Sequence, residues 1–190
     1  EDFEGYFDDT LRAGHYENDR AAVRCMIENS RAAIDELVSI GARFAREADG
    51  SLSYTREGAH SRPRILFHAD CTGKEITSRL LAEARKRSNI TLAPYTTLAD
   101  LITGDGECRG GVLRDNQSGK ISAVPARAVV LATGGVGGLF EHSTNFRILT
   151  GDGLALSLKH GAALEHPDYV QIHPTTLYTG KRGRRFLISE

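Results

Sequence analysis

Long apolar segments are absent from this chain of 190 residues. No apolar run approaches the roughly 20 residues that a helix needs to cross a bilayer, and the acidic opening EDFEGYFDD does not have the pattern of a secretory signal peptide. An excess of one charge is absent too, because 24 Lys and Arg stand against 25 Asp and Glu and the basic residues are scattered. We therefore expect neither a membrane nor nucleic acid as a partner.

Cysteine is scarce, and its few positions form no recognisable motif. Cys25, Cys71 and Cys108 are far apart and odd in number, without CxxC spacing. This excludes a disulfide framework and predicts a reduced, cytoplasmic compartment in which the thiols are buried or incidental. The seven histidines include no pair at HxxxH or HxxEH spacing, so no metal site is expected.

The remaining composition is that of an ordinary globular protein. Hydrophobic residues make up 40% and charged residues 26%, and a chain of this length can bury a core. The two ends are less usual. The first residues read like the middle of a loop, and the last, RRFLISE, stop within an apolar run. We interpret the chain as an internal fragment of a longer protein.

Helical periodicity dominates the first half of the chain. Asn18 and Asp19 can cap a helix that runs to about Phe44, with Gly41 as a plausible end. Thr72 and Glu75 have the spacing of a capping box, which predicts a second helix after them.

From Ile90 onward, short runs of β-prone residues alternate with turn residues. The part between 107 and 124 is typical of a hairpin or small meander. The run AVVLAT is almost continuously apolar, which favours a strand buried on both faces of a parallel sheet. A last helix is expected at about 152–160, ended by Gly161. The expected strands are Ile90–Ala93, Thr96–Ile102, Gly111–Arg114, Ile121–Val124 and Arg127–Ala132. Together these elements predict an α/β fold whose sheet is incomplete.

Two glycine-rich segments suggest a ligand. AVVLAT runs into Gly134 and Gly135, where the lack of a Cβ would let the backbone approach a flat or phosphate-bearing molecule. In the segment TGDG, Asp152 stands at the start of the last helix. Taken alone, it is more simply an N-cap, and the alternative is a hydrogen bond to a ribityl or ribose hydroxyl. In HPTT, Pro174 would aim the imidazole of His173.

Four motifs occur in one order along the chain: REGAHSRPRIL (56–66), ATGG (132–135), STNF with TGDGLA (143–155) and QIHPTTLY (171–178). This combination resembles the flavoprotein family of succinate dehydrogenase, fumarate reductase and L-aspartate oxidase. The resemblance implies a Rossmann-like FAD-binding domain at 1–169 and the beginning of an α+β capping domain at 170–190. The family's GxGxxG turn, which receives the FAD pyrophosphate, is absent, so the first βαβ unit is expected to be missing.

The resemblance also implies roles for particular residues. Non-covalent FAD would be contacted by Thr97, Leu98, Thr133, Gly134, Gly135 and Asp152. The substrate would be bound by Glu57, Gln171, His173, Ser189 and Glu190. The family's proton-transferring arginine would follow Glu190, so the isolated chain is expected to be inactive and to bind FAD weakly. Arg182, Arg184 and Arg185 do not match that arginine by position, and we expect them to form an exposed basic turn.

The resemblance implies that Glu57 distinguishes the branches of the family, and the alternative is a solvated charge on a loop. Its carboxylate would pair with the ammonium group of an amino acid, whereas it would repel succinate. The resemblance therefore implies oxidation of L-aspartate to iminoaspartate, with electrons passing to oxygen or fumarate. This would be the first step of NAD biosynthesis via quinolinate, with quinolinate synthase as a candidate partner. The alternatives are a succinate dehydrogenase or fumarate reductase flavoprotein subunit, and a non-catalytic domain that shares the fold.

Overall fold

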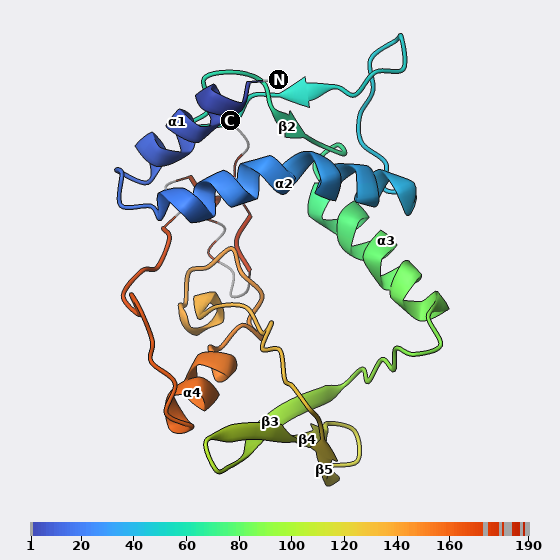
Figure 1. Cartoon of the computed structure of the whole chain (residues 1–190), viewed down its shortest axis with the longest axis vertical. Helices are drawn as coiled ribbons and strands as arrows, with labels where there is room; N and C mark the ends of the chain where they lie inside the picture. Colours follow the sequence, from blue (N-terminus) through green and yellow to red (C-terminus); the bar gives the residue numbers. More distant parts are fainter. Residues whose placement is uncertain (1, 173–174, 179, 181–183, 187, 189–190) are drawn as a thin grey trace. The chain divides into compact units, whose positions relative to one another are not determined.

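The computed structural model describes residues 2–172, 175–178, 180, 184–186 and 188. The chain falls into two compact units, Glu1–Leu92 and Ala93–Glu190. Helices and short strands make up the first unit, and a three-stranded sheet, a short helix and long irregular segments make up the second (Figure 1).

The core of the first unit lies between two helices, α1 (Phe3–Ala13) and α2 (Arg20–Ser39). The prediction of a loop at the start of the chain is wrong. Phe7 and Leu11 lie one helical turn apart, and both are buried against Val23 and Ile27 of α2. That burial favours a helix over a loop.

The boundaries of α2 follow its local chemistry. The side chain of Asp19 accepts hydrogen bonds from the backbone N–H groups of Ala21 and Ala22 at 2.8 and 3.0 Å, so the predicted cap is confirmed. The helix ends at Ser39, earlier than the predicted Phe44. Gly41 follows with a φ of 89°, the left-handed conformation that commonly terminates helices.

The helix α3 (Thr72–Lys86) begins without the predicted capping box. Thr72 lies inside the helix, and its hydroxyl oxygen accepts a hydrogen bond from the backbone N–H of His68 at 2.9 Å. The buried carboxylate of Glu75 accepts from the backbone N–H of Arg43 at 3.0 Å and from the guanidinium of Arg79 at 2.9 Å. Glu75 therefore joins α3 to the segment after α2 instead of capping its own helix.

Two very short strands, β1 (Tyr54–Thr55) and β2 (Ile65–Leu66), pair antiparallel in the first unit. They flank the loop of residues 56–64, which contains Glu57.

The sheet of the second unit is a meander of three antiparallel strands in the order β3-β4-β5. The strands are β3 (Thr96–Gly104), β4 (Glu107–Asp115) and β5 (Ile121–Pro125). Three of the predicted strands and the predicted meander are thereby confirmed. Asp105 and Gly106 connect β3 to β4 with φ angles of 54° and 79°, as a tight hairpin turn requires.

Two predicted strands do not form in the described part of the chain. Residues 90–93 are irregular, and so is the segment 127–132 that was expected to be a buried parallel strand. Val130 in that segment is 87% exposed. A parallel strand depends on hydrogen bonds from neighbouring strands, and no described strand pairs with this segment.

After this segment come the 3-10 turn η1 (Gly137–Leu139) and the helix α4 (Asp152–Lys159). The predicted last helix is therefore confirmed, and Gly161 follows it with a φ of 83°.

Two further features concern the chain as a whole. All three cysteines are exposed and free, so of the two alternatives, buried or incidental thiols, burial does not apply. Among the described residues, no helix has the length and apolar character needed to cross a membrane.

Candidate functional site

The two glycine-rich segments lie against each other in the second unit. The backbone N–H of Gly151 donates to the carbonyl of Gly135 at 3.1 Å, and the N–H of Gly138 donates to the carbonyl of Leu149 at 2.8 Å. A Cβ on Gly153 would lie 2.1 Å from Oγ1 of Thr133. The segments ATGG and TGDG, 18 residues apart in sequence, therefore form one structural element.

The conformation of this element depends on glycine. Gly134 and Gly151 have φ angles of 74° and 76°, which residues with a Cβ rarely adopt. Gly135 is exposed, and a Cβ placed on it would meet no atom within 4 Å. The backbone of Gly135 is thus uncovered, as a flat ligand lying on it would require, whereas a Cβ on Gly134 would lie 2.9 Å from Cδ2 of Leu149.

Asp152 does not cap its helix. Gly151 occupies the N-cap position of α4, and Asp152 is the first residue of the helix itself. Its exposed carboxylate accepts a hydrogen bond from the hydroxyl of Thr150 at 2.9 Å instead. The capping interpretation is therefore wrong, and the carboxylate is accessible to a ligand.

A cavity of about 970 Å³ opens beside this element. This is large enough for a ligand of the size of a flavin ring system with part of its chain. Apolar side chains and a group of polar side chains share its wall. The lining residues are Gly135, Val136, Gly137, Phe140, His142, Ser143, Thr144, Asn145, Leu154, Leu164, Glu165, His166, Pro167, Tyr169, Val170, Gln171, Ile172, Thr176 and Arg185.

Arg185 gives this cavity a fixed positive charge. Its residue is only 7% exposed, its guanidinium lies 3.1 Å from Nδ1 of His142, and it stacks over the ring of Tyr178 at 5.2 Å. The prediction of an exposed basic turn is wrong for Arg185, because this residue is buried. Its backbone N–H donates to the carbonyl of Ser143 at 2.7 Å, which holds the residue in place. Arg184 is exposed as expected, and Arg182 lies outside the described residues.

Arg185, His142 and the polar residues 143–145 are not among the site residues predicted from the sequence. The segment STNF contributed to the resemblance, and its density of hydrogen-bonding side chains was the available signal. For Arg185 the sequence contained no such signal, because Arg182 and Arg184 lie close to it and nothing distinguishes it from them. An arginine in a cavity wall attracts carboxylate or phosphate groups.

Of the residues predicted to bind FAD, only Gly135 lines this cavity, and Thr133, Gly134 and Asp152 lie in the joined glycine-rich segments outside its lining. The other two are Thr97 and Leu98. They belong to β3, and the hydroxyl of Thr97 accepts a hydrogen bond from the side-chain amide of Asn116 at 2.9 Å. Neither residue lines the cavity. Their role as FAD contacts stays a prediction.

The strand β3 is joined to α4 by Asp100. Its carboxylate lies 2.7 Å from Nε2 of His160 and 2.6 Å from Nζ of Lys159. The hydrogen bond with His160, and then the one with Lys159, hold the pKa of Asp100 well below its ordinary value. Asp100 therefore stays ionised and ties the meander to the helix that begins at Asp152.

The predicted substrate residues are only partly described. Gln171 is exposed and lines the cavity together with Gly135. His173, Ser189 and Glu190 lie outside the described residues. Glu57 belongs to the first unit, where its side chain is exposed on the loop between β1 and β2.

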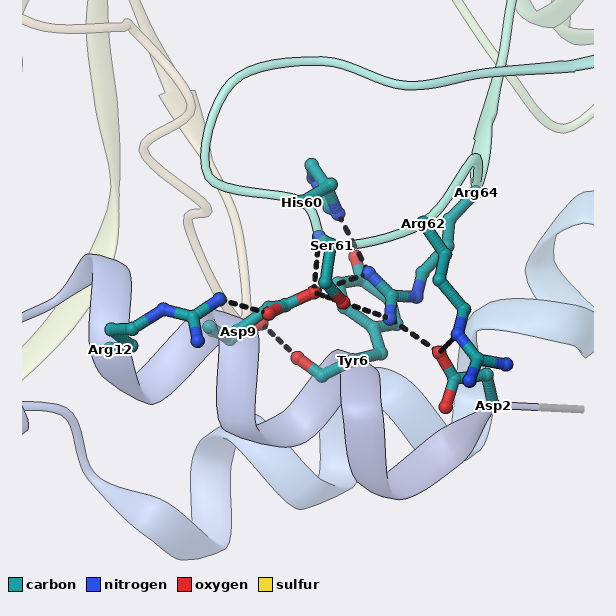
Figure 2. A network of polar contacts seen from close by, with 9 residues as sticks. Asp2, Tyr6, Asp9, Arg12, His60, Ser61, Arg62 and Arg64 are labelled. Carbon is teal, nitrogen blue, oxygen red and sulfur yellow. Dashed lines mark hydrogen bonds and ion pairs between the residues drawn. The ribbon is translucent and has the colours of Figure 1, made fainter.

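A network of polar contacts holds the second half of this loop against α1. Figure 2 shows the carboxylate of Asp9 pointing at Ser61 and Arg64. It accepts hydrogen bonds from the backbone N–H and hydroxyl of Ser61 at 2.7 and 2.6 Å and from the guanidinium of Arg64 at 2.6 Å. The bonds from Ser61, and then the contact with Arg64, hold the pKa of Asp9 far below its ordinary value.

Comparison with known proteins fits this geometry. The sequence matches the family described as FAD binding domain over residues 1–190, and the chain belongs to this family. Within it, the chain is a homologue of L-aspartate oxidases, in the group that also contains the flavoproteins of succinate dehydrogenase and fumarate reductase.

Two relatives are L-aspartate oxidases from clostridia. The enzyme of Clostridium perfringens is 40% identical over 191 residues, which covers 100% of this chain and 43% of that protein. The enzyme of Clostridium acetobutylicum is 43% identical over 186 residues, covering 97% of this chain and 42% of that protein. The chain thus spans about two fifths of the length of these relatives.

Solved structures of the group have the same fold. The quinol fumarate reductase of E. coli superposes with a TM-score of 0.90 at 32% identity, over 93% of this chain and 30% of that chain. The Sdh1 complex of Mycobacterium smegmatis gives a TM-score of 0.89 at 29% identity, over 100% of this chain and 34% of that chain.

Proposed function

We propose that this chain is part of an enzyme that binds FAD non-covalently and oxidises L-aspartate to iminoaspartate. The observation that carries the proposal is the sequence identity of 40% and 43% to two L-aspartate oxidases, over 100% and 97% of this chain. The packing of the ATGG segment against the TGDG segment, beside a large cavity, supports the proposal. In this proposal the first βαβ unit of the FAD-binding domain lies outside the chain, and the capping domain begins near residue 170.

The residues at the joined glycine segments fit such a cofactor. The backbone of Gly134 and Gly135 would lie along the flavin ring. A side chain on the uncovered Gly135 would keep the ring away, and Gly134 supplies the left-handed conformation of the turn. The exposed carboxylate of Asp152 would accept a hydrogen bond from a hydroxyl of the ribityl chain. Thr97 and Leu98 would contact the dinucleotide from β3. When bound, FAD would supply the redox chemistry, and the residues of this chain would hold and orient it.

The substrate would be held by its charges. L-aspartate has two carboxylates and one ammonium group. Gln171, His173, Ser189 and Glu190 are our candidates for the side that receives the dicarboxylate, and Glu57 for the ammonium. Pairing charges of opposite sign fixes the orientation of the substrate as well as its affinity. The proton would be taken by an arginine of the complete enzyme beyond the present chain, as the family resemblance implies.

A product with an imine bond reacts readily with water, so it would be used soon after release. We propose that it enters quinolinate and NAD synthesis in the cytoplasm, with oxygen or fumarate as the electron acceptor. Quinolinate synthase is then the candidate partner.

The second candidate is a dicarboxylate flavoprotein of the succinate dehydrogenase or fumarate reductase type. The high TM-scores to both enzymes favour it. It differs from the first candidate in the role of Glu57, because succinate has no ammonium group.

The test is the substitution Glu57→Gln in the complete flavoenzyme, with L-aspartate oxidation and fumarate reduction measured side by side. Glutamine keeps the shape and removes the charge. Removing one partner of a desolvated ion pair commonly weakens binding by orders of magnitude. The value of kcat/KM for L-aspartate should therefore fall about a hundredfold or more. Fumarate reduction should be kept or improved.

The matched control is Glu28→Gln, the same change at an exposed position of α2. It should leave both activities as they are. If Glu57→Gln lowers both activities by one factor, the assignment of L-aspartate as the substrate loses its basis and the second candidate is preferred.

A further inference from the structure

The loop that carries Glu57 has little structure of its own to hold it. Its flanking strands, β1 and β2, contain two residues each, and a two-stranded hairpin is marginally stable at best in water. Residues 56–59 are exposed, and Ala59 adopts a φ of 68°, which is unfavourable for a residue with a Cβ. The position of Glu57 must therefore be set by contacts with other elements of the first unit.

Asp9 on α1 provides the strongest of these contacts. The residue is 4% exposed, and one carboxylate oxygen receives both hydrogen-bonding groups of Ser61 as well as the guanidinium of Arg64 (Figure 2). The other oxygen pairs with Arg12 of the same helix. Bonds to an ionised, buried carboxylate are stronger than neutral ones. Asp9 thus joins α1 to a loop that lies 52 residues further along the chain.

The contact is transmitted from Ser61 towards Glu57 through His60. The backbone N–H of His60 donates to the carbonyl of Glu57 at 3.2 Å. Its ring packs against the ring of Tyr6 on α1, with 5.6 Å between centroids, and its Nδ1 lies 3.4 Å from Nη1 of Arg64. Both ends of the segment 57–61 are therefore connected to α1, directly or through one hydrogen bond.

We propose that Asp9 is a positioning residue for the substrate, which holds the loop of residues 56–64 so that the carboxylate of Glu57 is presented to the ammonium group of an amino acid. This inference rests on the proposed function. Asp9 touches no substrate in this role. An unsupported loop would lose conformational entropy when the substrate binds, and Asp9 reduces that loss by holding the loop in place beforehand. Asp9 therefore contributes to the affinity and orientation of the substrate.

The test uses Asp9→Asn in the complete flavoenzyme. Asparagine keeps the size and one acceptor oxygen but removes the charge that Ser61 and Arg64 share. The control is Asp8→Asn, the same change on the exposed side of the same helix. Asp9→Asn should raise KM for L-aspartate about tenfold to a hundredfold, as small displacements of binding groups do. In Asp9→Asn, the amount of bound flavin and KM for fumarate should stay within about twofold of the wild type. In Asp8→Asn, both of these and KM for L-aspartate should stay within the same limit.

A double substitution separates positioning from a general structural role. If Asp9 acts through Glu57, then adding Asp9→Asn to Glu57→Gln should change KM for L-aspartate by less than about twofold. Amide hydrogen exchange gives an independent reading. Peptides that cover residues 56–61 should exchange faster in Asp9→Asn, while those of β3 and β4 stay unchanged.

The proposal is overturned if Asp9→Asn affects L-aspartate and fumarate equally, if its effect persists undiminished beside Glu57→Gln, or if exchange of the loop does not change. Should Asp9→Asn not fold, Ser61→Ala removes one hydrogen bond of the same contact. It should raise KM for L-aspartate about threefold to tenfold, and an unchanged KM overturns the proposal. An enzyme in which Glu57→Gln is selective but Asp9→Asn is silent refutes the positioning role alone. One that does not oxidise L-aspartate refutes the proposed function as well.

Discussion

Replacing Gly153 by alanine tests whether the two glycine-rich segments are as closely packed as the structure indicates. The new Cβ would lie 2.1 Å from Oγ1 of Thr133 and 3.3 Å from its Cβ. Either segment must shift, and overpacking of this kind costs about 1–3 kcal/mol. Alanine also favours the helix by roughly 0.5–1 kcal/mol over glycine. The expected net loss in the free energy of unfolding is therefore about 0.5–2 kcal/mol.

Gly73 provides a matched control. It is also the second residue of its helix, α3, but a Cβ there would meet no atom within 4 Å. Gly73→Ala should stabilise the protein by roughly 0.5–1 kcal/mol. The two Gly→Ala substitutions should therefore change the free energy of unfolding in opposite directions. Urea denaturation followed by circular dichroism measures both.

Thr133→Ala removes the clashing oxygen and should restore most of the stability that Gly153→Ala loses. The double substitution should therefore show a favourable coupling of about 0.5–2 kcal/mol. In the complete flavoenzyme, Gly153→Ala should also reduce the flavin retained after gel filtration, because it displaces residues 133–135. If Gly153→Ala stabilises the protein as much as Gly73→Ala does, the packing of ATGG on TGDG is refuted.

Two further predictions concern the carboxylates of Asp152 and Asp9. Asp152→Ala in the complete flavoenzyme should weaken FAD binding by roughly 0.5–3 kcal/mol through a lost hydrogen bond, while KM for L-aspartate changes less. Flavin titration measures this, and an unchanged FAD affinity would refute the assignment. The pKa of Asp9 in the folded protein is lowered, chiefly by Ser61 and then by Arg64, so its stabilising effect is complete above its unfolded pKa of about 3.9 and is lost as the pH falls through the folded pKa. The difference in urea midpoint between the wild type and Asp9→Asn should therefore be constant from pH 7 to about 5 and shrink below about 4. A difference that already shrinks near pH 6 would contradict this.

Local sequence was a good guide where local forces decide the structure. Asp19 caps α2 because its side chain reaches the backbone N–H groups two and three residues ahead. Asp105 and Gly106 make a hairpin because both adopt positive φ angles. Thr72 and Glu75 do not form the capping box that their spacing predicts, because the carboxylate of Glu75 binds the backbone N–H of Arg43, 32 residues earlier in the chain. Residues 127–132 do not form the predicted strand, because a strand requires partners that its own sequence cannot supply.

The sequence by itself determined the family, since motifs in a fixed order need no coordinates to be recognised. It also supplied the candidate residues for binding a flavin and a substrate. Only the tertiary structure decided which of them meet. It packed Gly153 on Thr133, placed Arg185 in a cavity wall and joined Asp9 to the loop of Glu57. The physical reason is that burial and ion pairing act through space between residues that are distant in the chain, and a sequence pattern contains no such distances.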